Sequence, residues 1–431
     1  MIRIVKLGDM PKEEILKREL PTVKAEAVVS EIIRNVREKG DRALYLYTEK
    51  YDKVSLSSLT VGEEEIREAV ERVGPEFMAL LARAADNIRL FHEKQQRSGF
   101  FFTKENGVVL GQRVVPVDRA GVYVPGGTAP LCSTVLMDVI PAKIAGCPEV
   151  ILTTPPGKDG KVAPAVLAAA SVAGADRVFK VGGAQAIAAM AYGTETVPRA
   201  DKIVGPGNAY VAEAKRQVYG AVSVDMIAGP SEILVISDGR SDPRVLAADL
   251  LSQAEHDVNA SAVLITDCPV LAQKTADEIE RQLLLLSREK IARASIEQNG
   301  KIIVTDDLEE ALELSNELAP EHLELAVDDP FSLLGKVRHA GSVFLGRNTP
   351  EALGDYLAGP NHTLPTGGTA RFSSPLSVDD FVKKIQVTSF PAAALDAVRK
   401  DVAEFAMAEG LDGHARSALI RGGIAGKEED A

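Results

Sequence analysis

The chain has 431 residues, of which 45% are hydrophobic and 26% charged, as is ordinary for a globular enzyme of two or three domains. Its net charge of −13 argues against nucleic acid as a partner. Three cysteines without a Cys-x-x-Cys motif, Cys132, Cys147 and Cys268, favour a reducing compartment. Because no signal peptide or long apolar stretch is evident, we expect a cytoplasmic protein that does not bind a membrane.

Apolar residues at helical spacing predict helices over the first part of the chain, at residues 25–36, 44–51 and 63–92. Gly40 is placed to end the first of these helices, and Gly74-Pro75 interrupts the last.

From Val122 onward, short β-branched runs alternate with Ala-rich amphipathic segments. This alternation predicts parallel sheets with right-handed crossovers, arranged as two doubly wound α/β units. Ligands of such folds usually lie beyond the carboxyl ends of the strands. The expected strands are 121–124, 150–153, 177–181, 202–204, 233–237, 262–266, 301–304, 324–327 and 342–345, and the expected helices are 134–144, 163–172, 184–192, 209–219, 245–254, 270–285 and 308–316.

The chain from about Pro375 is predicted to be mostly helical, beginning at 381–385 and continuing over 392–408. It is small for an independent core, so we expect it to pack against another subunit, most simply in a dimer. Residues 427–431 have the composition of a solvated acidic tail.

Three glycine-rich turns follow strands of the first α/β unit, at 124–127, 181–185 and 205–210. Glycine lets a ligand phosphate approach the backbone, and the helix that follows offers its N-terminal amides. None matches Gly-x-Gly-x-x-Gly, and a tight turn between strand and helix is the alternative for each. Together they favour a nucleotide cleft without naming the nucleotide.

Four of the six histidines have polar neighbours that suit a site. Gln253 and His256 share a helix face, Glu321 and His322 follow Pro320 at the start of a strand, and Asp355 and His362 lie in a glycine-punctuated loop, with His414 near the C-terminus. Gln253, His256, Asp355 and His414 would supply the mixed O and N donors that suit zinc, with cobalt or manganese as substitutes. Solvated helix ends, turns and surface ion pairs are the structural alternatives, since sequence does not show that these residues meet.

At these residues the chain resembles histidinol dehydrogenase over nearly its whole length. The matching segments lie in one order along the chain, and together they are far more specific than any one alone. They are 120–127, 182–186, 205–208, 228–232, 251–256, 319–323, 354–356, 361–366 and 409–411, followed by His414.

The resemblance implies a fold of two incomplete Rossmann-like domains whose terminal tails join a homodimer. On this basis, the N-terminal arm is 1–20, the first α/β domain comprises 21–121 and 231–374, the NAD-binding domain is 122–230 and the tail is 375–431.

The resemblance also implies the ligands of each site. Zinc would be held by Gln253, His256, Asp355 and the partner subunit's His414, and NAD would contact Tyr123, Gln185 and Asn208. L-Histidinol would contact the zinc ligands together with Ser231, His322, His362 and the partner subunit's Glu409.

The implied activity is oxidation of L-histidinol to L-histidine through L-histidinal by two NAD, the last steps of histidine biosynthesis. His322 would act as the base in both hydride transfers, and Glu321 would deprotonate the water that attacks the aldehyde. Cys132 follows a glycine turn, but no neighbouring base is evident to activate it as a nucleophile.

Three other functions are weighed against this one. They are a related dehydrogenase acting on another polyol, a non-catalytic metal- or nucleotide-binding protein, and a metallohydrolase. The acid–base pair Glu321-His322 counts against the second, and the absence of His-Glu-x-x-His counts against the third.

Overall fold

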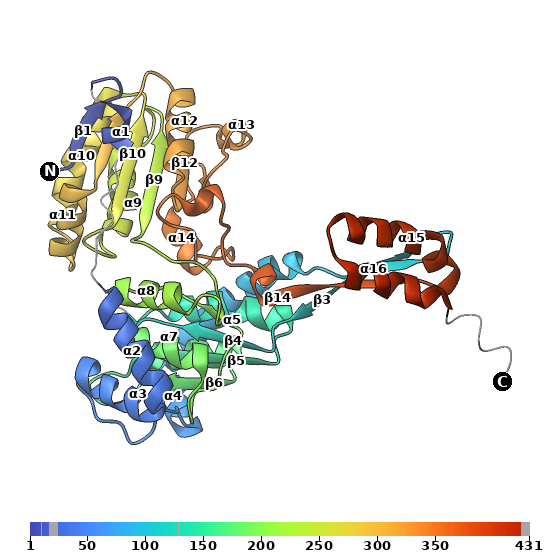
Figure 1. Ribbon diagram of the computed structural model, residues 1–431. Coiled ribbons are helices and arrows are strands. Elements are labelled where there is room, and N and C mark those ends of the chain that lie inside the picture. Colours follow the sequence, from blue (N-terminus) through green and yellow to red (C-terminus); the bar gives the residue numbers. More distant parts are fainter. Residues whose placement is uncertain (10, 17–24, 127–129, 424–431) are drawn as a thin grey trace. The chain divides into compact units, whose positions relative to one another are not determined.

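The computed structural model describes residues 1–9, 11–16, 25–126 and 130–423 (Figure 1). Residues between 119 and 224 contribute the strands of a five-stranded parallel sheet. Its strands lie in the order β6-β5-β4-β7-β8, so the direction of strand addition reverses between β4 and β7. The strands are β4 (Arg119–Tyr123), β5 (Glu149–Thr154), β6 (Arg177–Lys180), β7 (Lys202–Val204) and β8 (Ser223–Val224).

Helices cover both faces of this sheet. Successive strand residues point to opposite faces, so Val150 and Leu152 pack into one core while Ile151 packs into the other. The first core includes α4 (Glu63–His92), α5 (Cys132–Ala145) and α6 (Pro164–Ala173), and the second includes α2 (Glu26–Lys39), α3 (Asp41–Tyr47), α7 (Gly183–Tyr192) and α8 (Ala209–Val218).

A second parallel sheet has six strands in the order β1-β11-β10-β9-β12-β13. Along the chain, strands β10 and β11 are added on one side of β9, and β12 and β13 are added on the other side. The strands are β1 (Arg3–Lys6), β9 (Glu232–Ser237), β10 (Ser261–Thr266), β11 (Lys301–Val304), β12 (His322–Ala326) and β13 (Ser342–Leu345).

This sheet too is covered on both faces. One core contains α9 (Pro243–Ala254), α10 (Pro269–Leu283) and α11 (Glu289–Gln298), and the other contains residues of α1 (Lys12–Leu16), α12 (Leu308–Leu318) and α13 (Pro330–Leu334). The expected α/β architecture with parallel sheets is confirmed, and each expected strand from 121 to 345 is present within three residues of its predicted bounds.

The helices of residues 25–92 pack on the five-stranded sheet, whereas the domain bounds expected from the resemblance grouped 21–121 with 231–374. Periodicity shows that a helix has an apolar face but not which sheet receives it. The N-terminal arm also differs from expectation, because Arg3–Lys6 pairs with β11 as an edge strand.

Residues 96–116 and, as far as the structure describes them, 382–423 form a separate unit. It contains an antiparallel sheet in the order β14-β3-β2 and two helices, α15 (Ala392–Ala408) and α16 (Asp412–Leu419). The strands are β2 (Phe100–Thr103), β3 (Val109–Pro116) and β14 (Val382–Ser389).

The predicted helix start at 381–385 is wrong, because Val382–Ser389 is a strand paired with β3. Most of its side chains are exposed, so it lacks the alternating apolar pattern by which a strand is recognised, and its partner is remote in sequence. Gly127 and residues 427–431 lie outside the described residues. Within those residues, no helix is long and apolar enough to cross a membrane.

Gly205, in the third glycine turn, lies where both the backbone conformation and a close neighbour disfavour any side chain. Its φ is +113°, and a Cβ there would lie 2.0 Å from the carbonyl oxygen of Tyr123. At Gly220, φ is +97°, but a Cβ there would meet no atom of the described residues within 4 Å. We expect Gly220→Ala to lower the free energy of unfolding by about 1 kcal/mol through strain alone, and Gly205→Ala to cost about 1–3 kcal/mol more through the clash. Urea unfolding of both variants measures this, and equal losses would contradict it.

Candidate active site at the amino ends of β9 and β12

Four polar residues meet where two neighbouring strands begin. His322 is the first residue of β12 and is paired with Ile233 of β9, so Glu321 and His322 lie beside Ser231 and Glu232. Sequence reasoning expected ligands at the carboxyl ends of the strands. Here the clustered side chains lie at the amino ends of the strands in the six-stranded sheet.

His322 is buried and held in one tautomer. Its Nδ1 lies 2.9 Å from the carbonyl oxygen of Glu232, and because a carbonyl only accepts, Nδ1 carries the proton and Nε2 keeps its lone pair. Burial lowers the pKa of His322 from 6.5 to about 4, although the charge of Asp355 opposes this. The ring is therefore a neutral base at physiological pH.

Glu321 is hydrogen-bonded to the backbone of the same residue, Glu232. Its Oε2 accepts a hydrogen bond from the Glu232 N–H at 2.8 Å and lies 3.6 Å from His322 Nδ1. Burial raises the pKa of Glu321 well above its ordinary value, more than the bond from Glu232 lowers it. Such a carboxylate has a strong affinity for a proton.

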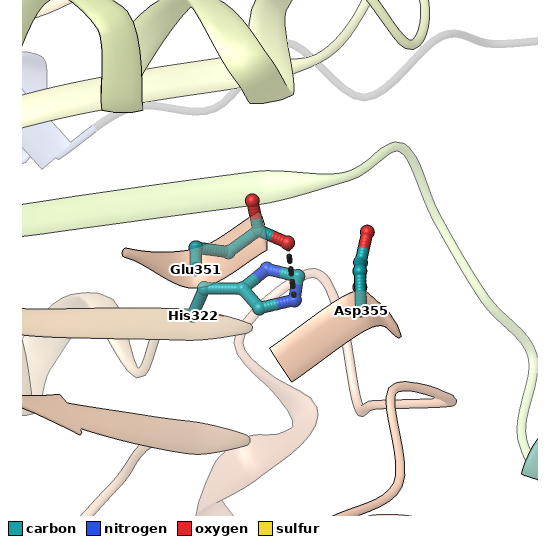
Figure 2. Close-up of side chains that lie close together, drawn as sticks. All are labelled: His322, Glu351 and Asp355. Carbon is teal, nitrogen blue, oxygen red and sulfur yellow. Dashed lines mark ion pairs between the residues drawn. The ribbon is translucent and has the colours of Figure 1, made fainter. Parts of the chain in front are cut away.

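A short helix, α14 (Glu351–Tyr356), adds two carboxylates. Glu351 and Asp355 are four residues apart and so share one helix face. Figure 2 shows the ring of His322 beside both of them, with Nε2 3.7 Å from Glu351 Oε1. One ligand atom from each of these three residues lies within 4.8 Å of the others, close enough to share a metal ion.

The helix α9 brings Gln253 and His256 to this cluster. Gln253 is 1% exposed and hydrogen-bonds to Glu351, while its Oε1 has no hydrogen-bond partner among the described residues. His256 is exposed just beyond the helix end and acts electrostatically on both His322 and Asp355.

His362 closes the cluster on the side of Asp355. Its Nδ1 lies 3.3 Å from Asp355 Oδ1, and its Nε2 lies 3.2 Å from the hydroxyl of Thr134 at the start of α5. Burial lowers the pKa of His362, but the bond to Asp355 and its charge outweigh this and raise it. In turn, burial raises the pKa of Asp355, and His362 brings it down to about 2.

A pair of acidic residues, Glu324 and Asp249, lies next to the first residue of α14. Glu324 Oε1 accepts from the Glu351 N–H at 2.6 Å, and Glu324 is hydrogen-bonded to Asp249. Burial raises the pKa of both carboxyls, that of Asp249 to about 6. Two adjacent buried carboxyls share a proton more readily than they both ionise.

The residues expected to contact NAD lie at the carboxyl side of the five-stranded sheet. Tyr123 ends β4, and its hydroxyl accepts from the Gly183 N–H at 3.1 Å. Gln185 is buried in the first turn of α7. Asn208 caps α8 by accepting from the N–H groups of Tyr210 and Val211. The turns after β4 and β7 flank the point where strand order reverses, where ligands of such sheets bind.

The remaining expected contacts are placed as follows. Ser231 is half-buried immediately before β9. Glu409 and His414 are exposed in the second unit, the former at the end of α15 and the latter in α16. Two of the expected zinc ligands, Gln253 and Asp355, are both hydrogen-bonded to Glu351. A third, His256, interacts electrostatically with Asp355.

Sequence reasoning did not identify Glu351, Glu232 or Thr134. The spacing of Glu351 from Asp355 is a detectable signal, because residues four apart on a helix share a face. Glu232 acts through its backbone, and Thr134 lies 228 residues from His362, so neither leaves a local pattern.

Comparison with known proteins identifies the family. The histidinol dehydrogenase family model matches residues 16–422. Histidinol dehydrogenase of Syntrophotalea carbinolica is 55% identical over 409 residues, which are 94% of this chain and 95% of that protein. The chain belongs to the histidinol dehydrogenase family. It is therefore an oxidoreductase.

Two further comparisons agree with this family. Histidinol dehydrogenase of Bacillus cereus (strain ATCC 10987 / NRS 248) is 55% identical over 91% of each chain. The crystal structure of histidinol dehydrogenase from Elizabethkingia anophelis has a TM-score of 0.92 at 38% identity, covering 97% of this chain and 98% of that one.

The buried Glu351 predicts how stability depends on pH in this member of the histidinol dehydrogenase family. Burial raises its pKa from 4.5 to about 8, so between these values the folded protein keeps a proton that the unfolded chain releases. Its stabilising contribution is full below about pH 4.5 and is lost as pH rises through 8. We expect metal-free Glu351→Gln to gain stability relative to metal-free wild type from pH 5 to pH 8.

Urea unfolding in a chelator at several pH values measures this difference. Glu71→Gln, at an exposed position, is the control and should differ little from wild type. A stability difference for Glu351→Gln that shrinks as pH rises would contradict the assignment.

Proposed function

We propose that this protein is a histidinol dehydrogenase in activity, oxidising L-histidinol to L-histidine through L-histidinal with two NAD, as the last steps of histidine biosynthesis in the cytoplasm. The observation that carries the proposal is the neutral ring of His322, whose Nε2 is free to accept a proton within a cluster of potential metal ligands. Family membership supplies the substrate.

The residues present fit one zinc ion per subunit. Gln253 Oε1 and Glu351 Oε1 are buried and lack hydrogen-bond partners among the described residues, which leaves two acceptor oxygens without a donor. Asp355 and His256 add an anionic oxygen and a nitrogen, the mixed donor set that suits zinc. We propose that Gln253, His256, Asp355 and the partner subunit's His414 hold it. When bound, zinc would grip and orient the substrate.

His322 would take the hydroxyl proton of the alcohol as the substrate carbon loses hydride to NAD, giving the aldehyde. Its Nδ1–H bond to Glu232 holds the ring so that Nε2 accepts the proton. General base catalysis of this kind typically contributes about 10²–10⁴-fold in rate.

Glu321 would take a proton from water as the water adds to the aldehyde carbonyl, and protonated His322 would give its proton to the carbonyl oxygen, which yields the hydrate and a neutral ring. The raised pKa of Glu321 makes it a stronger base than an exposed glutamate. The hydrate then loses hydride to a second NAD and its hydroxyl proton to His322, which gives the acid. Burial raises the pKa of Cys132, which disfavours a thiolate route.

The substrate would contact Ser231, His322, His362 and the partner subunit's Glu409, in addition to the zinc ligands. NAD would bind along Tyr123, Gln185 and Asn208, where the reversal between β4 and β7 supports a nucleotide site. The two parallel sheets with reversed strand order support two incomplete Rossmann-like domains.

The second unit supports a homodimer with shared active sites. Strand β2 is an edge of its sheet, and its three phenylalanines are 50–57% exposed. Phe405 is 76% and Met407 57% exposed on α15. Exposed apolar surface on an edge strand and on a helix of the same unit is typical of an interface. A second copy would cover it and bring Glu409 and His414 to the partner's site.

The stoichiometry of NADH formation tests the activity. We expect two NADH for each L-histidinol consumed, because alcohol and aldehyde are oxidised in turn, and absorbance at the NADH band measures it. Chelation should abolish turnover and added zinc restore it. One NADH per substrate, or full activity without metal, would contradict the proposal.

Mixed dimers test the sharing of sites. His256→Ala and His414→Ala should each be inactive, since each removes a proposed ligand. Dissociated and reassociated together, they should recover activity, because a hybrid has one site with neither substitution. No recovery in dimers shown by differential tags to be mixed would contradict shared sites.

A further inference from the structure

Three consecutive residues beside the candidate active site are hydrogen-bonded to one turn of α5. Asn361 Nδ2 donates to the carbonyl oxygen of Met137 at 2.6 Å, His362 Nε2 is bonded to Thr134 Oγ1, and Thr363 Oγ1 donates to Asp138 Oδ1 at 2.8 Å. Residues at positions 134, 137 and 138 are three and four apart, so they share one face of the helix.

The chain before His362 is fixed as well. Asn87 Nδ2 of α4 donates to the carbonyl oxygen of Leu357 at 2.8 Å. Gly359 has a φ of +104°, and a Cβ there would lie 2.6 Å from the carbonyl oxygen of Asn87. The segment between Asp355 and Thr363 is therefore held at both ends, with His362 near its second attachment.

Asp138 is an unusual residue for this attachment. It is fully buried in a helix whose other inward residues, apart from Thr134, are apolar. Its Oδ2 has no hydrogen-bond partner among the described residues and lies 3.1 Å from where a Cβ of Gly205 would be. A buried carboxyl is costly unless it is bonded, so its bond to Thr363 matters to the position of both residues.

The surroundings of Asp138 carry charge of both signs. Asp225 raises its pKa, while His362 and Lys215 lower it, after the dominant effect of burial, which brings it to about 7. Lys215 Nζ in turn donates to Asp225 Oδ1 at 2.6 Å and to the carbonyl oxygen of Gly205. Asp138 thus lies between the Gly205 turn and the segment that carries His362.

We propose that Asp138 and Thr363 are positioning residues whose hydrogen bond holds the ring of His362 against Asp355 for binding of the imidazole-bearing substrate. Neither takes part in proton or hydride transfer. The inference rests on the proposed function for its substrate, and on the three bonds to α5 for its geometry.

The decisive variant is Thr363→Val, which keeps the shape and removes the hydroxyl. Loss of a bond to a buried carboxyl should raise KM for L-histidinol about tenfold, with kcat and KM for NAD changed less than twofold. Thr363→Ser, which retains the hydroxyl, should restore KM to within about twofold. Thr275→Val removes a buried hydroxyl from α10, outside the site, that has no hydrogen-bond partner among the described residues, and it controls for the change of side chain itself.

A double-mutant cycle assigns the effect to the pair. Asp138→Leu alone and Asp138→Leu with Thr363→Val should raise KM about as much as Thr363→Val alone, because one bond is lost in each. If Asp138→Leu does not fold, Asp138→Asn, which keeps an acceptor oxygen, should leave KM within about threefold. Additive effects, or a KM for Thr363→Val equal to that of Thr275→Val, would overturn the proposal.

A crystal structure of Thr363→Val separates this inference from the proposed function. The ring of His362 should be displaced beyond hydrogen-bonding distance of Asp355, and an unmoved ring would overturn the positioning role whatever the protein's activity. Absence of turnover of L-histidinol by wild type, with the ring displaced in the variant, would overturn only the proposed function.

Discussion

Crowding of buried carboxylates at the amino ends of β9 and β12 is the constraint on which the site depends. Glu321, Glu324, Glu351 and Asp355 cannot all be ionised in so little space without compensation. Backbone N–H groups compensate Glu321 and Glu324, and His362 compensates Asp355. Glu351 has only the neutral ring of His322, 3.7 Å from its Oε1, as a potential charge partner, and burial, with the charge of Asp355, raises its pKa in this shortage of positive charge. A cation beside it would relieve that shortage.

Two kinds of chemistry lie at opposite strand ends of the two parallel sheets. Glycine turns at the carboxyl ends of β4 and β7 offer N–H groups and helix N-termini, which suit phosphate. The amino ends of β9 and β12 offer carbonyl and carboxylate oxygens, which suit a proton or a cation. Hydrogen bonds connect α5, the helix after β4, to residues 361–363 beside the carboxylate cluster. One sheet can therefore supply the N–H groups and the other the oxygen ligands.

The sequence predicted the parallel strands with a buried apolar centre, such as Val150–Leu152 in β5, but it missed β1, which is mostly exposed, and β8, which has only two residues. It failed at β14, whose side chains are mostly exposed, and at the choice of sheet covered by residues 25–92. In the site, Glu321 and His322 stood out as an adjacent acid and base. Glu324 and Asp138 did not, since a buried carboxyl in a strand or helix has no local signature until its partner, 27 or 225 residues away, is known.

The amide of Gln253 is explained by the charges around it. Amides are uncommon ligands of zinc compared with histidine or carboxylate. A glutamate at this position would add another negative charge beside Glu351 and Asp355, where burial and then the charge of Asp355 already raise the pKa of Glu351. An amide supplies an oxygen donor without that charge and also hydrogen-bonds to Glu351. As a proposed ligand, this neutral amide would let the neighbouring carboxylates be buried together.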